Sequence, residues 1–144
     1  MKLRCIILLL VMLSLHSYAQ TGKVLDFKVK TAANSKDRTE MLDALRSHLH
    51  DKWKLEFVFD VNYFKVGNNY AWFTGEAERK DGKKIVFTDD VYDCCHVEAL
   101  FQKKNGKWAI AASGAFSTDV WYDGLDKKYP DAPELIFPKE LRSR

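Results

Sequence analysis

The stretch LEFVFDVNYF, residues 55–64, decides the fold class of this 144-residue chain. Its large apolar side chains recur at every second position: Leu55, Phe57, Phe59, Val61 and Tyr63. Successive side chains of an extended chain point to opposite faces, so this spacing predicts a β-strand with one face on a hydrophobic core. Asp60 falls on the other face, where we expect it to be exposed.

Further strand and turn patterns follow this segment. The predicted strands are residues 70–79, 84–88, 96–103 and 108–117. The connections are VGNNY (66–70), KDGK (80–83) with an Asp-Gly pair, and KNGK (104–107) with an Asn-Gly pair. Asp-Gly and Asn-Gly tolerate the positive φ angles of tight hairpin turns, so the pattern indicates consecutive antiparallel strands.

A helix is predicted before the first of these strands. Asp37 followed three positions later by Glu40 is typical of a capping box. Apolar residues then recur at helical spacing: Met41, Leu42, Leu45, Leu49 and Trp53. A single apolar stripe of this kind predicts a helix that lies on a sheet.

The two ends of the chain carry weaker patterns. Residues 20–36 are mostly polar and predict an N-terminal arm or an edge strand. Residues 119–129 predict a short helix that Thr118 or Asp119 caps and that ends before Pro130. The apolar side chains of the tail PDAPELIFP (130–138) are expected to return to the body of the protein.

This order of elements predicts an α+β fold. An N-terminal helix would pack on a curved antiparallel sheet of four or five strands, with a short C-terminal helix after it. Residues 37–144 form a single predicted domain, because no linker or internal repeat divides them.

The N-terminus predicts export from the cytoplasm. Lys2 and Arg4 precede the apolar run IILLLVML (6–13), and SYA (17–19) supplies the small residues of a cleavage site. We expect residues 1–19 to be a cleaved signal peptide, because the run is too short for a membrane span. The alternative is an N-terminal anchor. The mature domain is therefore expected in the periplasm or outside the cell.

The charge balance argues against a nucleic-acid partner. The chain has 23 basic and 20 acidic residues, and removal of Lys2 and Arg4 leaves 21 basic residues against the same 20. A net charge near +1 provides no field that would attract nucleic acid or anionic lipid. No later apolar run is long enough for a membrane span of the mature chain.

Several segments occur in an order that resembles a known group of proteins. They are LDALR (42–46), LEFVFDV (55–61), NNYAWF (68–73), VEALFQKKNGKWAIAASG (97–114) and STDVWYDGLDKKYPDAP (117–133). Together they resemble a family of small exported proteins of Gram-negative bacteria that has no assigned activity. TDVWY is the most specific element. The ending SYAQ is similar to signal peptides of Bacteroides-like bacteria.

The predicted order of elements is also similar to that of cystatin-like and NTF2-like folds. In those folds the sheet wraps a helix and often leaves a conical pocket. This similarity concerns the fold, and a fold alone does not supply a function. The family offers no catalytic residues to transfer, and Cys94 and Cys95 are not part of its common pattern.

The motif DCCH, residues 93–96, holds the candidates for metal or redox chemistry. In a strand, Cys95 would share a face with apolar Val97, whereas Cys94 and His96 would share the more polar face. Buried structural cysteines are the favoured interpretation. A metal site formed by Cys94, Cys95 and His96 is one alternative. A disulfide between Cys94 and Cys95 is another, although neighbouring Cα atoms normally lie closer than relaxed disulfides require.

Aromatic side chains are the candidates for ligand binding. Packing in the core is their default role, but they can also form the wall of a pocket. The residues expected to do so are Trp72, Phe73, Trp108, Trp121 and Tyr122.

The expected function is the non-catalytic binding of a small apolar or amphipathic molecule or of a protein partner, without a cofactor. No nucleophile elbow, P-loop or dinucleotide fingerprint occurs in the sequence. An NTF2-like isomerase or dehydratase is an alternative and would need an inward-facing carboxylate or His–Asp pair. A second alternative is a structural or interaction protein that forms a homodimer or another assembly through its sheet.

Overall fold

The computed structural model describes residues 22–88 and 91–142. The predicted signal peptide, residues 1–19, lies outside them. Within these two ranges, no helix has both the length and the apolar character needed to cross a bilayer.

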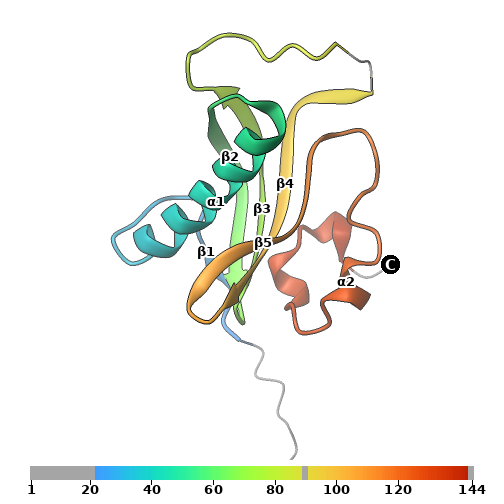
Figure 1. Ribbon diagram of the computed structural model, residues 1–144. Coiled ribbons are helices and arrows are strands. Elements are labelled where there is room, and N and C mark those ends of the chain that lie inside the picture. The colour runs from blue at the N-terminus through green and yellow to red at the C-terminus, as the bar shows by residue number, and fades with distance from the viewer. Residues whose placement is uncertain (1–21, 89–90, 143–144) are drawn as a thin grey trace, which may run out of the picture.

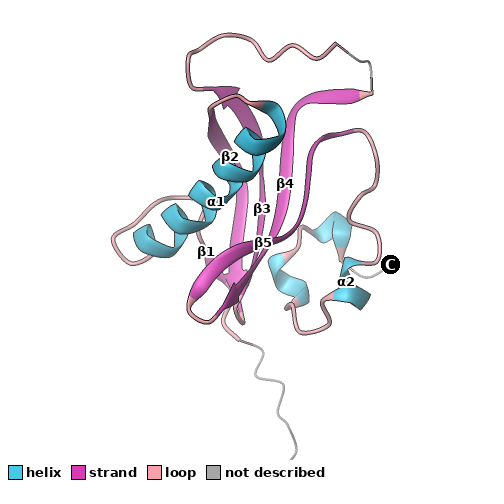
Figure 2. Ribbon diagram, in the orientation of Figure 1, coloured by secondary structure: helices cyan, strands magenta, loops and turns pink. Residues whose placement is uncertain are grey.

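Five antiparallel strands form one curved sheet with the order β1-β2-β3-β4-β5 (Figures 1 and 2). The strands are β1 (Leu25–Asp26), β2 (Phe57–Gly67), β3 (Tyr70–Arg79), β4 (Tyr92–Lys104) and β5 (Lys107–Ser117). The helices are α1 (Ser35–Trp53), α2 (Leu125–Lys128) and two 3-10 turns, η1 (Glu134–Ile136) and η2 (Lys139–Leu141). The predicted α+β class, with a helix on a curved sheet, is confirmed.

The helix α1 lies on one face of the sheet, which we call the inner face (Figure 1). Met41, Leu42, Leu45 and Leu49 are all buried there, as the helical spacing predicts. The sheet contributes a set of buried aromatic rings to the same core: Phe57, Phe64, Phe73, Phe101, Trp108 and Phe116. The arm also joins this core, because Phe27 is buried with its ring centroid 6.0 Å from that of Phe64.

Two tight turns connect strands of the sheet, and the Asn-Gly turn has the predicted positive φ angles. Asn105 and Gly106 have φ angles of 51° and 76°, and they connect β4 to β5. Asn68 and Asn69 have φ angles of 46° and 63° between β2 and β3. Two successive positive φ angles match the right-handed twist of the flanking strands, which explains the two hairpins.

The predicted face of β2 is correct only up to Val61. A bulge between Val61 and Tyr63 inserts one extra residue, so the side chains after it change face. Phe64 and Val66 therefore enter the inner core, and Tyr63 lies on the opposite face, with the second apolar cluster. The expectation that Tyr63 shares a face with Phe57 is wrong, whereas Asp60 is exposed as predicted.

Residues 84–88 do not form the predicted strand. The turn at 80–82 is present, but β4 begins only at Tyr92 and pairs with β3 as far as Glu76 and His96. Ile85 and Phe87 pack on the core instead, and Val86 between them is exposed. The ring of Phe87 lies 5.0 Å from that of Trp53 and 5.0 Å from that of Phe116.

Both predicted helix caps are wrong. The helix α1 begins at Ser35, and Asp37 binds Lys103 with Oδ1 3.1 Å from Nζ. Glu40 Oε1 accepts a hydrogen bond from the backbone N–H of Trp108 at 3.1 Å. The C-terminal helix is only Leu125–Lys128, after Gly124, so Asp119 is not its cap. In α1, the two expected cap residues make long-range contacts instead. In α2, the helix begins directly after Gly124.

Candidate functional site

The outer face of the sheet, opposite α1, is covered by residues 120–142 (Figure 1). We call these residues the C-terminal segment. A second apolar cluster forms between it and the sheet, and its buried members are Tyr70, Trp72, Leu100, Leu125, Ile136 and Phe137. The tail thus returns to the body of the protein, as predicted, with Ile136 and Phe137 buried.

A pair of indole rings is the centre of this contact. The rings of Trp72 and Trp121 are stacked, with centroids 5.5 Å apart and an interplanar angle of 3°. Trp121 Nε1 donates a hydrogen bond to Glu98 Oε2 at 3.1 Å. A Cβ atom at Gly114 would lie 2.0 Å from Trp121 Nε1, so only glycine leaves room for this ring on β5.

The five aromatic residues expected to line a pocket do not form one wall. Trp72, Trp121 and Tyr122 belong to the outer cluster, whereas Phe73 and Trp108 are buried in the inner core. Adjacent residues of a strand point to opposite faces, so Trp72 and Phe73 are separated by the sheet itself. Of the five, Tyr122 lines the pocket described next.

The inner face is filled by side chains. Phe64, Phe73 and Phe101 have no exposed area, and α1 lies over them. Within residues 22–88 and 91–142, no Asp, Glu or His residue is buried. The described core therefore lacks the inward carboxylate or His–Asp pair that an NTF2-like enzyme would need.

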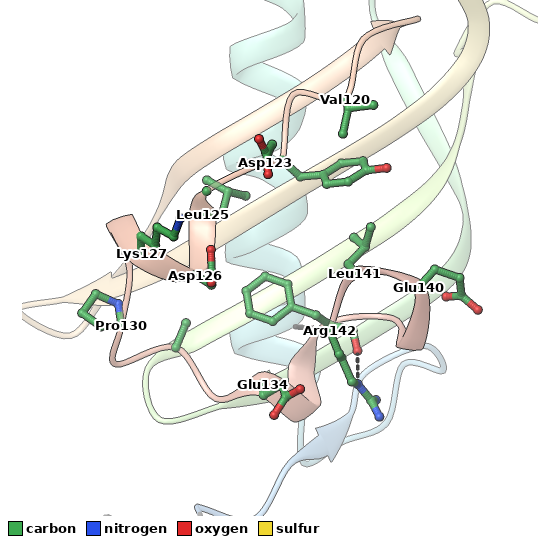
Figure 3. A pocket seen from close by; sticks show the side chains of 14 residues that line it. Val120, Asp123, Leu125, Asp126, Lys127, Pro130, Glu134, Glu140, Leu141 and Arg142 are labelled. Carbon is green, nitrogen blue, oxygen red and sulfur yellow. Dashed lines mark hydrogen bonds between the residues drawn. The ribbon is translucent and has the colours of Figure 1, made fainter. Parts of the chain in front are cut away.

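A pocket of about 540 Å³ lies within the C-terminal segment (Figure 3). Leu125, Phe137 and Leu141 supply its apolar surface, and the first two of these are buried. In Figure 3, α2 with Asp126 lies on one side and Leu141 on the other. Small-molecule sites typically have volumes of roughly 300–1,000 Å³ and combine apolar walls with a few polar groups. This pocket fits that description.

Acidic side chains outnumber basic ones around the pocket. Its lining includes four carboxylates and two cations: Asp123, Asp126, Glu134, Glu140, Lys127 and Arg142. All four carboxylates are exposed, and we call them the acidic entrance of the pocket. The resulting excess of negative charge favours a ligand with a positive group.

One hydrogen bond attaches a wall of the pocket to the sheet, and a second lies within the C-terminal segment. Tyr63 Oη donates to the carbonyl oxygen of Phe137 at 3.2 Å, and Arg142 Nε donates to the same oxygen at 2.9 Å. Tyr63 can reach this carbonyl because the bulge in β2 turns it to the outer face. The sequence gives no periodic signal for this pocket, because its residues belong to turns and very short helices.

The cysteines lie at the start of β4. Cys94 and Cys95 form a disulfide, and the peptide bond between them is cis. Cys94 is exposed, and Cys95 packs partly against the inner core. This arrangement is the vicinal disulfide that the sequence left as an alternative.

His96 lies between two carboxylates on the outer face. Its Nδ1 is 3.5 Å from Glu76 Oε1, and its Nε2 is 3.3 Å from Glu98 Oε1. The part of the chain that the structure describes has no cluster of three His, Cys, Asp or Glu side chains able to hold a metal ion. The contact with Glu76 joins β4 to β3, whereas the contact with Glu98 lies within β4.

Comparisons with known proteins identify no relative: no protein-family model matches the chain, and neither a curated protein nor a solved structure matches it.

Proposed function

We propose that this protein is an exported binding protein that takes a small amphipathic cation into the pocket of the C-terminal segment. The observation that carries the proposal is the combination of an apolar wall and an acidic entrance around about 540 Å³. The signal-peptide pattern of residues 1–19 supports export.

The two parts of the pocket suit the two parts of such a ligand. Leu125, Phe137 and Leu141 offer apolar surface for an alkyl or aryl group. The carboxylates of Asp126 and Glu134 would face a protonated amine at the entrance. Exposed ion pairs contribute about 0.2–1 kcal/mol each, so each carboxylate should strengthen binding by up to about fivefold.

The test compares three probes with the same alkyl chain and different head groups. Octylamine, octanol and octanoate are titrated into the full mature protein by isothermal titration calorimetry. We expect octylamine to bind most tightly and octanoate most weakly. Octanoate binding as tightly as octylamine would contradict the role of the acidic entrance, and heat from none of the probes would contradict the pocket itself.

Matched variants separate charge from apolar contact. The double substitution Asp126→Asn and Glu134→Gln should weaken octylamine by roughly two- to twentyfold and leave octanol unchanged. Leu141→Asn should weaken both probes. The control removes two exposed carboxylates of α1, Asp43→Asn and Asp51→Asn, and should bind octylamine as the unsubstituted protein does.

A further inference from the structure

A second hollow, separate from the C-terminal pocket, contains the disulfide. It has a volume of about 440 Å³, and Cys94 and Cys95 line it together with residues of β3 and of the segment after it. The pairing of β3 with β4 ends at Glu76 and His96. Residues 77–79 of β3 therefore extend beyond the part of β3 that pairs with β4. The disulfide and these residues line the same hollow.

The disulfide is accessible from this hollow. Cys94 is exposed, whereas Cys95 packs partly against the core. An incoming sulfur atom attacks a disulfide at the sulfur it can reach. Cys94 Sγ is therefore the expected point of attack, and Cys95 Sγ is the leaving group.

The hollow has a positive charge. Lys83 and Lys84 line it and are exposed, and Arg79 lines it while it is paired with Asp81. Glu78 is the acidic side chain in the lining. Lysine side chains near a sulfur atom stabilise its thiolate, and they also attract negatively charged molecules. Both effects would favour reduction of this disulfide by an anionic thiol.

We propose that Cys94–Cys95 is a site of thiol–disulfide exchange with a small anionic thiol, which Lys83 and Lys84 attract into the hollow. The thiolate attacks Cys94 Sγ, the Cys94–Cys95 bond breaks, and the Cys95 thiolate leaves and takes a proton from water. A second thiolate attacks the sulfur of the bound thiol and releases Cys94. Two small thiols become one disulfide, and their two electrons convert the cysteine pair to two thiols.

The experiment measures the rate at which three thiols reduce the native mature protein: glutathione, which is anionic, 2-mercaptoethanol, which is neutral, and cysteamine, which is cationic. Samples are quenched with an alkylating reagent, unfolded and digested with trypsin. Mass spectrometry then counts alkyl groups on the peptide that contains both cysteines. Before any thiol is added, this peptide should carry none.

A charge-reversed variant, Lys83→Glu with Lys84→Glu, isolates the effect of the lysines. The ratio of the unsubstituted rate to the variant rate cancels the intrinsic reactivity of each thiol. We expect this ratio to be at least about threefold for glutathione, smaller for 2-mercaptoethanol and smallest for cysteamine. The control variant, Lys30→Glu with Lys36→Glu, reverses two exposed lysines outside the hollow and should leave every rate unchanged.

Two results would overturn the proposal. One is a peptide alkylated at both cysteines before a thiol is added, which would show that the native pair is reduced. The other is the same rate ratio for glutathione and cysteamine, which would show that the lysines do not select the charge of the thiol.

Discussion

Trp121 is stacked on Trp72, with the ring centroids 5.5 Å apart and the planes within 3° of parallel. Trp72 belongs to β3 and is fully buried, whereas Trp121 belongs to the C-terminal segment. The contact therefore joins the segment that forms the pocket to the sheet. Aromatic pairs contribute about 0.5–1.5 kcal/mol beyond the area they bury, so this pair helps to hold the pocket in place.

Gly114→Ala should displace the C-terminal segment. The new methyl group would overlap the indole of Trp121, and overpacking of this kind costs about 1–3 kcal/mol. We expect a lower urea midpoint and faster proteolysis after residue 120. Trp121→Phe, which keeps an aromatic ring but loses the hydrogen bond to Glu98, is the comparison and should cost less. Unchanged proteolysis in Gly114→Ala would contradict the close packing of Trp121 on β5.

Glu40→Ala should weaken the attachment of the β4–β5 hairpin to α1. Glu40 Oε1 accepts the backbone N–H of Trp108, and an amide left without its partner costs about 1–3 kcal/mol. Hydrogen exchange at the Trp108 amide should accelerate accordingly. Glu40→Gln keeps an oxygen acceptor at the same place and should preserve most of the protection. Faster exchange confined to the first turn of α1 would instead support the capping box.

Deletion of Asn62 should remove the bulge and preserve the fold. Val61 pairs with Gly75 and Tyr63 pairs with Thr74, so Asn62 is the extra residue of β2. Without it the strand alternates regularly, and Phe64 and Val66 stay on the inner face. We expect the deletion variant and Asn62→Ala both to show one cooperative urea transition. Loss of cooperative unfolding in the deletion variant alone would contradict this pairing.

The Asp26–Lys65 pair should make the β1–β2 contact sensitive to acid. The side-chain hydrogen bond from Lys65 lowers the pKa of Asp26 below 3.8. A lowered carboxyl pKa in the folded state stabilises the fold above the unfolded value and loses this contribution as pH falls through the folded pKa. Because Asp26 is largely exposed, Asp26→Asn should cost less than about 1 kcal/mol at pH 7.

The measurement for Asp26 is a comparison of urea midpoints at pH 7 and below pH 3, with a titration of its carboxyl signal by NMR. The difference between Asp26→Asn and the unsubstituted protein should disappear at the lower pH. Asp43→Asn, at an exposed acid outside this contact, serves as the control. An NMR pKa at or above 3.8 would contradict the pairing with Lys65.

Local sequence patterns predicted the elements whose causes are local. The helical stripe from Met41 to Leu49 and the alternation from Phe57 to Val61 each place apolar side chains on one face within a few residues. The Asn-Gly pair at 105–106 fixes a turn through the φ angles of two residues. Residues close in the sequence determine each of these elements, so a local pattern is enough to predict them.

The candidate sites depended on contacts that are distant in the sequence. Trp72 and Phe73 are adjacent, yet they belong to two different cores, because the sheet has a layer on each face. The pocket exists only because the C-terminal segment folds back on the outer face. Phe137 contacts Trp72 and Tyr63, which precede it by 65 and 74 residues.

The sequence by itself therefore determined the α+β class and the position of α1 and of the four strands β2 to β5. Only the tertiary structure decided that residues 84–88 stay out of the sheet, where Ile85 and Phe87 pack on the inner core instead. It also decided that Tyr63 changes face, since one extra residue reverses the alternation. Long-range packing determines these outcomes, because its free energy is larger than the intrinsic helix or strand propensity of a short segment.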